Sequence, residues 1–200
     1  MLSAEIVGVR YPSMLASVGT RQGLVPGHAR VLISRTALGS LVPPGWDGRI
    51  LHKETTVGSP IDEAWWAWTT SEGMASWWAK DSWIDLRIGG PYELYFLLDQ
   101  RRGSQGSEGC RILSFRPPEM LSFSWNFPPS IPEIRFEHTW IVLRFVPLGP
   151  AETRVVLDQL GWKQGPAWEE GWKYFDDAWG RVLEAFRTRF PSREARGKSG

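Results

Sequence analysis

Side chains suited to catalysis or metal binding are few in this sequence, and their spacing argues against most such chemistry. The three histidines, His28, His52 and His138, lie far apart in the chain. No HxxxH, HxH or CxxC pattern occurs, so we expect neither a metal site nor a cofactor. Cys110 is the single cysteine. It has no His or Cys near it in the sequence, so we interpret it as a small core residue rather than a nucleophile.

Two further patterns have structural explanations. Gly89-Gly90 precedes a predicted strand rather than a helix, which favours a tight hairpin turn over a phosphate-binding loop. The adjacent carboxylates Glu169-Glu170 fall on a predicted helix, where neighbouring side chains diverge. We therefore expect solvated carboxylates there and no acid/base pair.

Arg144 and Asp158 each interrupt an otherwise apolar strand. If both point inward, they form a buried pair that presents hydrogen bonds to a ligand. If both point outward, they are ordinary surface charges, and we favour that reading. Together with His138 and Tyr95, they are the only residues we nominate for an enzyme that steers carbonyl groups and protons.

Aromatic residues are the strongest signal in the sequence. Thirteen of the 200 residues are tryptophan. The stretch 167–190 predicts one long helix that begins after Pro166 and is stopped by Pro191. Its apolar residues follow a 4-3-4-3-4 spacing that places them on one stripe: Trp168, Trp172, Phe175, Trp179, Val182 and Phe186. Such bulky rings either complete a filled core or leave an apolar cavity under the helix.

The elements that would position these rings can be located by periodicity. Ser59 should cap a helix over 61–70, and a second helix should cover 71–79. Trp77-Trp78 at its end has two readings: one indole in the core and one at a pocket rim, or both sealing the helices onto the sheet. Strands are predicted over 50–57, 83–87, 91–98, 108–116, 121–127, 138–146 and 153–162. Strands segregated from helices indicate an α+β fold with a curved antiparallel sheet around the last helix.

The residues that we expect to line a ligand cavity come from both short helices, the strands and the long helix. They are Trp68, Met74, Trp78, Tyr95, Phe123, Trp125, Trp140, Arg144, Asp158, Trp172, Phe175 and Trp179.

Charge and composition divide the chain into three parts. Residues 1–47 are rich in Gly, Ser, Pro and Arg and lack a sustained period, so we expect a poorly ordered extension. Residues 48–190 form the predicted domain, with sixteen basic and nineteen acidic side chains, and residues 191–200 form a flexible tail.

The sequence contains no stripe of basic residues that could bind a phosphate backbone, and no apolar run long enough to span a membrane. We therefore expect neither nucleic-acid nor membrane binding. The lone cysteine favours a reducing, cytoplasmic location.

Five segments occur in a distinctive order along the chain: EAWWAWTTSEGMASWW, IDLRIGGPYEL, EGCRILSFRPPEMLSFSW, ETRVVLDQLGW and EEGWKYFDDAWGRVLEAF. Over roughly residues 48–190 this ordered set resembles the bacterial relatives of the heat-shock-protein-90 ATPase activator, including CalC-type self-resistance proteins, within the SRPBCC or START-like superfamily. The resemblance implies a helix-grip fold, in which a seven-stranded-type sheet curls around the C-terminal helix and leaves a cavity for apolar small molecules.

Three functions follow from this resemblance and the residues. We favour binding of a hydrophobic or aromatic small molecule between sheet and helix, without catalysis. The first alternative is an enzyme of the polyketide cyclase or aromatase kind on the same fold, which needs polar groups inside the cavity. The second is a partner of a heat-shock-protein-90 chaperone.

Overall fold

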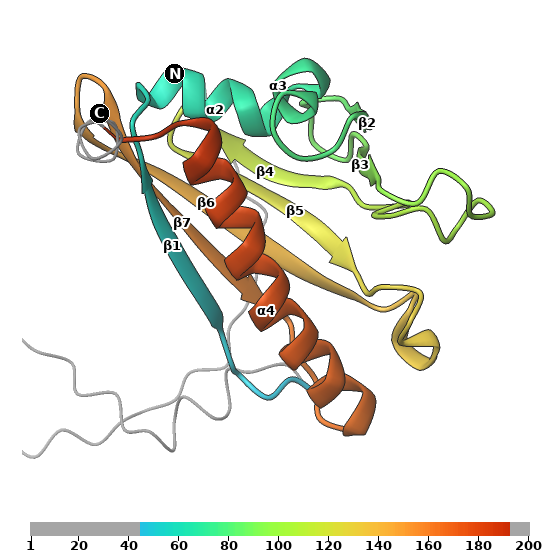
Figure 1. The fold of residues 1–200 in the computed structure, drawn as a ribbon. Coiled ribbons are helices and arrows are strands. Elements are labelled where there is room, and N and C mark those ends of the chain that lie inside the picture. The colour runs from blue at the N-terminus through green and yellow to red at the C-terminus, as the bar shows by residue number, and fades with distance from the viewer. Residues whose placement is uncertain (1–44, 193–200) are drawn as a thin grey trace, which may run out of the picture.

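One strand, two short helices, six further strands and a long helix follow one another along residues 45–192, the part of the chain that this computed structural model describes (Figure 1). This order confirms the α+β class. The expected extension 1–47 and tail 191–200 lie mostly outside the described residues. The elements are β1 (Leu51–Val57), α2 (Ile61–Thr69), α3 (Ser71–Ala75), β2 (Asp81–Ile84), β3 (Tyr92–Tyr95), β4 (Ile112–Arg116), β5 (Met120–Asn126), the 3-10 helix η1 (Pro132–Ile134), β6 (His138–Gly149), β7 (Glu152–Leu160) and α4 (Pro166–Arg189).

The strands form two antiparallel sheets rather than one continuous seven-stranded sheet. The larger sheet has the order β1-β7-β6-β5-β4, and β2 pairs only with β3. The hairpin nevertheless adjoins the β4 end of the larger sheet through backbone hydrogen bonds: Gly89 N–H donates to Ile112 O, Ile112 N–H to Gly90 O, and Tyr92 N–H to Cys110 O. Isolated bridges pair Pro91 with Arg111 and Tyr95 with Gly106. The pairing between β3 and β4 is therefore interrupted, which corrects the expected continuous sheet.

Alternation along the central strands decides which side chains face α4. We call this face of the sheet the inner face and the opposite one the outer face. Along β5, β7 and residues 138–145 of β6 the odd-numbered residues are buried, because they face the inner side of the sheet. The fully buried apolar members of this set are Leu121, Phe123, Ile141, Leu143, Val155 and Leu157, and the polar members Thr153 and Gln159 are fully buried as well.

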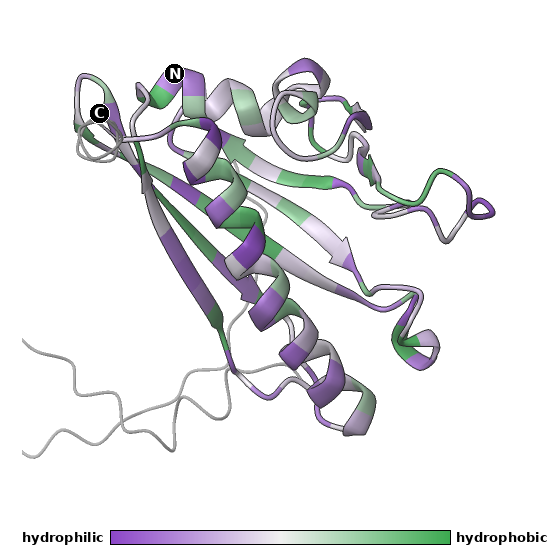
Figure 2. Ribbon diagram, viewed as in Figure 1, coloured by the Kyte–Doolittle hydropathy of each residue, from purple (hydrophilic) through white to green (hydrophobic). Residues whose placement is uncertain are grey.

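The long helix α4 crosses the inner face of the sheet (Figure 1). Pro166 is its first residue and the helix ends two residues before Pro191, as the sequence predicts. The stripe is buried except for partly buried Trp172, and Leu183 extends it. Figure 2 shows hydrophilic residues along the side of α4 that faces away from the sheet. These observations confirm the predicted helix-grip arrangement.

Two ion pairs attach α4 to the edge strand β1 and the segment before it. Lys53 Nζ lies 2.7 Å from Asp176 Oδ1, and Arg49 Nη2 lies 2.7 Å from Glu169 Oε1. Exposed pairs of this kind contribute little stability individually. They nevertheless show that α4 lies against the β1 edge of the sheet.

The short helices α2 and α3 cover one end of the inner face, although two details of their prediction were wrong. Ser59 does not cap α2, because its hydroxyl donates to Pro60 O and Pro60 occupies the cap position. The second helix ends at Ala75 instead of residue 79. The Ser76 hydroxyl donates to Gly73 O, and this local bond competes with continuation of the helix. None of the described helices is long and apolar enough to cross a membrane.

Candidate functional site

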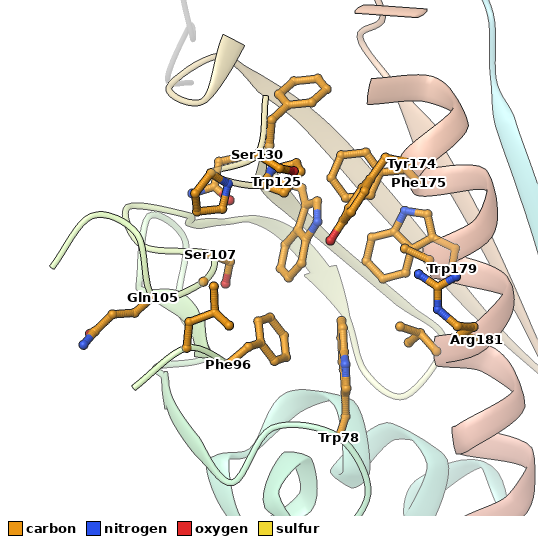
Figure 3. A pocket seen from close by; sticks show the side chains of 18 of the residues that line it. Trp78, Phe96, Gln105, Ser107, Trp125, Ser130, Tyr174, Phe175, Trp179 and Arg181 are labelled. Carbon is orange, nitrogen blue, oxygen red and sulfur yellow. The ribbon is translucent and has the colours of Figure 1, made fainter. Parts of the chain in front are cut away.

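An apolar cavity of about 590 Å³ lies where α4, the end of β5 and two loops meet (Figure 3). Ligand sites commonly measure about 300–1,000 Å³. Most of the lining is aromatic or aliphatic. The lining residues are Trp78, Phe96, Leu97, Gln105, Gly106, Ser107, Trp125, Asn126, Phe127, Pro128, Pro129, Ser130, Tyr174, Phe175, Ala178, Trp179, Arg181, Val182 and Ala185.

Three indoles from different elements form the centre of the lining. Trp78 follows α3, Trp125 lies on the inner face of β5 and Trp179 lies on the buried stripe of α4. The ring centroid of Trp125 is 5.4 Å from that of Trp179 and 6.0 Å from that of Trp78. Figure 3 shows the three rings around one space, with Phe96 beside Trp78, their ring centroids 5.2 Å apart. Trp125 is 5% exposed and Trp179 only 1%, so most of each ring packs on its neighbours and a small part of it borders the cavity.

A buried chain of hydrogen bonds holds Trp179 in place. Its indole Nε1–H donates to Gln159 Oε1 over 2.7 Å, and Gln159 Nε2–H donates to Thr139 Oγ1 over 2.9 Å. The Thr139 hydroxyl then donates to Trp125 O. Each buried polar atom of the chain has a partner, which avoids the cost of an unmade hydrogen bond. The ring of Trp179 is thereby fixed with its polar edge toward the sheet.

The loop wall of the cavity is organised by a buried ion pair. Glu108 accepts hydrogen bonds from the backbone N–H groups of Gly103, Gln105 and Gly106. Arg135, only 5% exposed, donates to the carbonyl oxygens of Gly103 and Gly106 and to Phe127 O. Its guanidinium lies 3.5 Å from Glu108. Burial lowers the pKa of Arg135, and Glu108 acts in the opposite direction.

Four of the twelve predicted ligand residues line the cavity: Trp78, Trp125, Phe175 and Trp179. The structure also distinguishes between the two readings of the Trp77-Trp78 pair. Trp77 packs on Trp68 and donates its indole N–H to Ala67 O, while Trp78 reaches the cavity. The pair therefore places one ring in the core and the other at the pocket.

Three predicted residues lie in the filled core instead. Trp68, Met74 and Phe123 are fully buried, and none of them lines the cavity. Trp68 packs against Phe186 with centroids 5.6 Å apart, and Phe123 stacks on Tyr92 at 4.1 Å. These side chains occupy the end of the concave face beneath α2 and α3 and pack there on other buried rings.

Four other predicted residues lie away from the cavity. Arg144 and Trp140 are even-numbered residues of β6 and therefore project from the outer face. Asp158 is on the same face, where it pairs with Arg144 at 2.6 Å and meets His52 Nδ1 at 2.6 Å. The surface reading of Arg144 and Asp158 is therefore the right one. Trp172 packs against Trp162 on the β1 side of α4.

The polar residues nominated for an enzyme do not meet in the cavity. Tyr95 is the last residue of β3 and donates its hydroxyl to Glu93 Oε2 over 2.7 Å. Partial burial and the hydrogen bond to Glu93 raise the pKa of Tyr95 to about 12. His138 is exposed at the start of β6. Neither residue lines the cavity, and nor does Arg144 or Asp158. The geometric condition for the cyclase-type alternative is therefore not met by these residues.

Cys110 is fully buried, as its interpretation as a core residue predicts. Burial raises the pKa of its thiol to about 12, so almost no thiolate is present near neutral pH. Within residues 45–192, no cluster of three His, Cys, Asp or Glu side chains could hold a metal ion.

Sequence reasoning missed the loop and helix-flank residues of the cavity. The predicted strand 91–98 includes Phe96 and Leu97, but β3 ends at Tyr95, so both residues lie in the loop that follows it and line the cavity from there. Gln159 could have been identified, because alternation from Val155 and Leu157 places it on the inner face. Arg135 gave no signal within its proline-rich loop.

A curved antiparallel sheet that holds a long C-terminal helix, with two short helices after its first strand, defines the helix-grip class. Residues 59–190 match the family described as Activator of Hsp90 ATPase homolog 1-like protein. Because this match covers well over half of the chain, the protein belongs to that family and so to the SRPBCC superfamily, as the resemblance predicts. No curated protein sequence matches the chain.

Solved structures share the fold at low sequence identity. MLL2253 from Mesorhizobium loti is 17% identical with a TM-score of 0.56, over 70% of this chain and 96% of that one. CalU16 from Micromonospora echinospora is 22% identical with a TM-score of 0.51, over 72% of this chain and 78% of that one. The Aha1 dimer from Colwellia psychrerythraea is 14% identical with a TM-score of 0.53, over 72% of this chain and 98% of that one. At these identities the similarity establishes the fold alone.

Proposed function

We propose that the cavity beside α4 binds an apolar or aromatic small molecule. The observation that carries this proposal is a space of about 590 Å³ surrounded by three indoles and several other apolar side chains. Removing apolar surface from water contributes about 25 cal/mol per Å². A ring system placed among Trp78, Trp125 and Trp179 gains this term together with aromatic contacts.

Apolar side chains at the edge of the cavity support the same proposal. Phe96 is 42% exposed and Leu97 is 43% exposed, although both line the cavity. Tyr174 on the opposite side is 41% exposed. Exposed apolar groups around a hollow are typical of binding sites. A guest between these side chains would cover them.

The test uses N-phenylnaphthylamine, a neutral dye that fluoresces only in apolar surroundings. We expect it to bind the native protein and to be displaced by apolar compounds that fit the cavity. Ala178→Phe places a ring inside the cavity and should abolish most of the signal. Ala151→Phe, at the exposed turn between β6 and β7, is the matched control and should leave it intact. Equal dye binding by both variants, with unchanged melting temperatures, would contradict the proposal.

A second candidate function is contact with an Hsp90-type chaperone, and family membership favours it. The family description names an activator of Hsp90 ATPase. The test is a titration of this protein into a purified bacterial Hsp90 homologue while ATP hydrolysis is measured. Saturable stimulation would support the chaperone role. A flat ATPase rate, with no complex detected by size-exclusion chromatography, would remove it.

A further inference from the structure

Arg181 is the only charged residue that lines the cavity. It lies on α4 two residues beyond Trp179, and Figure 3 shows its guanidinium directed toward the same space as the three indoles. The rest of the lining carries no acidic side chain. Arg181 is therefore the single formal charge on the cavity lining.

The carboxylates nearest to Arg181 on the helix do not neutralise it. Glu184, three residues further on, accepts hydrogen bonds of 2.9 and 2.6 Å from Arg187. Asp177, one turn earlier, forms no ion pair with Arg181, and no other carboxylate within residues 45–192 does so. The guanidinium consequently has donors free for an acceptor that enters the cavity.

Tyr174 places a second donor on the same side. It lies seven residues before Arg181, and two helical turns return a side chain to nearly the same face. Both residues line the cavity, and Figure 3 shows the Tyr174 hydroxyl pointing into it. The α4 side thus offers a phenol and a guanidinium, whereas the sheet and loop sides offer rings and only neutral polar side chains, namely Gln105, Ser107, Asn126 and Ser130.

We propose that the ligand is an amphipathic acid: an aromatic or apolar body with one anionic group, such as a carboxylate or sulfonate. Its body lies among Trp78, Trp125 and Trp179, and its anionic group accepts hydrogen bonds from Arg181 and Tyr174 at the cavity edge. This inference rests on the proposed function and adds the charge of the ligand. Hydrogen bonds between charged groups are roughly twice as strong as neutral ones.

The same residues disfavour the opposite charge. Indole faces attract cations, so an aromatic cavity alone would also suit an organic ammonium ion. An unpaired Arg181 in the wall repels such a ligand, and no carboxylate in the lining compensates. Charge on the wall therefore discriminates between two ligands that the rings would accept equally.

The experiment compares two dyes with nearly the same ring system. N-phenylnaphthylamine is neutral, and anilinonaphthalene sulfonate carries one negative charge. The ratio of their dissociation constants is measured for the native protein and for Arg181→Gln. We expect the substitution to weaken the sulfonate dye about five- to tenfold and to leave the neutral dye within twofold. Arg181→Lys keeps the charge and should restore most of the sulfonate affinity.

Arg154→Gln is the control for net charge. Arg154 is exposed on the outer face of β7 and is remote from the cavity, so its substitution should leave both affinities unchanged. If both dyes bind but Arg181→Gln weakens neither or weakens both equally, the charge assignment is wrong while the cavity proposal stands. If neither dye binds, or Ala178→Phe does not reduce binding of the neutral dye, the cavity proposal fails and the charge assignment fails with it.

Discussion

Gly171 and Gly180 occupy the same helix in opposite environments. A Cβ atom built on Gly171 would lie 2.5 Å from Cε1 and 2.9 Å from Cδ1 of Phe127, whose ring is fully buried. A Cβ on Gly180 would meet nothing within 4 Å. Gly171 therefore permits close packing of Phe127 on α4, whereas no packing in the structure accounts for Gly180.

Alanine substitutions at these two glycines should have opposite effects. Gly180→Ala removes backbone freedom from the unfolded chain and should raise the free energy of unfolding by about 0.5–1 kcal/mol. Gly171→Ala gains the same term but overpacks the core, so we expect a net loss of about 1–2 kcal/mol. Urea denaturation of both variants checks this. Equal stabilisation by both would show that Phe127 does not pack on the helix as described.

The thiol of Cys110 should be chemically inert in the native protein. Burial raises its pKa to about 12, so at pH 8 only about one thiol in ten thousand is ionised. We expect Ellman's reagent to label one thiol per chain in urea and none in the native state before unfolding occurs. Because the unfolded chain loses this proton first, the thiol's contribution to stability should disappear between about pH 9 and pH 12. Fast labelling of native protein would refute the assigned burial.

Neighbouring residues on β7 show what the sequence could and could not reveal about the site. Asp158 attracted a functional hypothesis because a charge interrupts an apolar strand, yet alternation places it on the outer face. Gln159, the next residue, is the polar group that supports Trp179. Strict alternation along the strand would have assigned Asp158 to the outer face and Gln159 to the inner face. The partner of Gln159 lies on another element, so the hydrogen-bond chain itself could not be predicted.

At the scale of elements, the long loop between β3 and β4 forms one wall of the cavity and contains no regular secondary structure. Its shape depends on Glu108, which accepts hydrogen bonds from three backbone N–H groups. It also depends on Arg135, which donates to carbonyl oxygens of two separate segments. Each partner satisfies groups that the loop would otherwise leave unpaired. We therefore expect the loop and the cavity wall to depend on this one ion pair.

Replacing Arg135 should loosen the wall. Arg135→Met leaves Glu108 without its partner and removes the donors to Gly103 and Gly106, at a cost of about 3–5 kcal/mol. We expect faster amide hydrogen exchange over residues 103–108 and weaker binding of N-phenylnaphthylamine. Arg101→Met, an exposed substitution in the same loop, is the control. Unchanged exchange in Arg135→Met would mean that the loop is held by other contacts.

Regular elements were more predictable than connections. The residues on the inner face of β5 and the aromatic stripe of α4 follow from periods of two and 3.6 residues, so Trp125, Phe175 and Trp179 were placed correctly. The early end of α3 and the positions of Phe96 and Leu97 depend on local side-chain bonds and on distant residues. Periodicity carries no information about such interactions.

At the scale of the molecule, α4 divides the concave face of the sheet into a filled part and an open part. Trp68, Met74 and Phe186 occupy the end beneath α2 and α3 and are fully buried. The other end is bounded by loops, and there the rings of Trp125 and Trp179 face the cavity. Both readings of the aromatic stripe, filled core and open cavity, are therefore correct for different parts of the same helix.

The indoles themselves provide the most direct test of a ligand site in the open part. Each tryptophan gives its own indole N–H signal in a proton–nitrogen correlation spectrum, and single Trp→Phe variants assign the signals. On addition of N-phenylnaphthylamine, we predict shifts for Trp78, Trp125 and Trp179 and none for outer-face Trp140 or 57% exposed Trp83. The largest shifts at Trp83 or Trp140, with the three cavity indoles unmoved, would contradict the account.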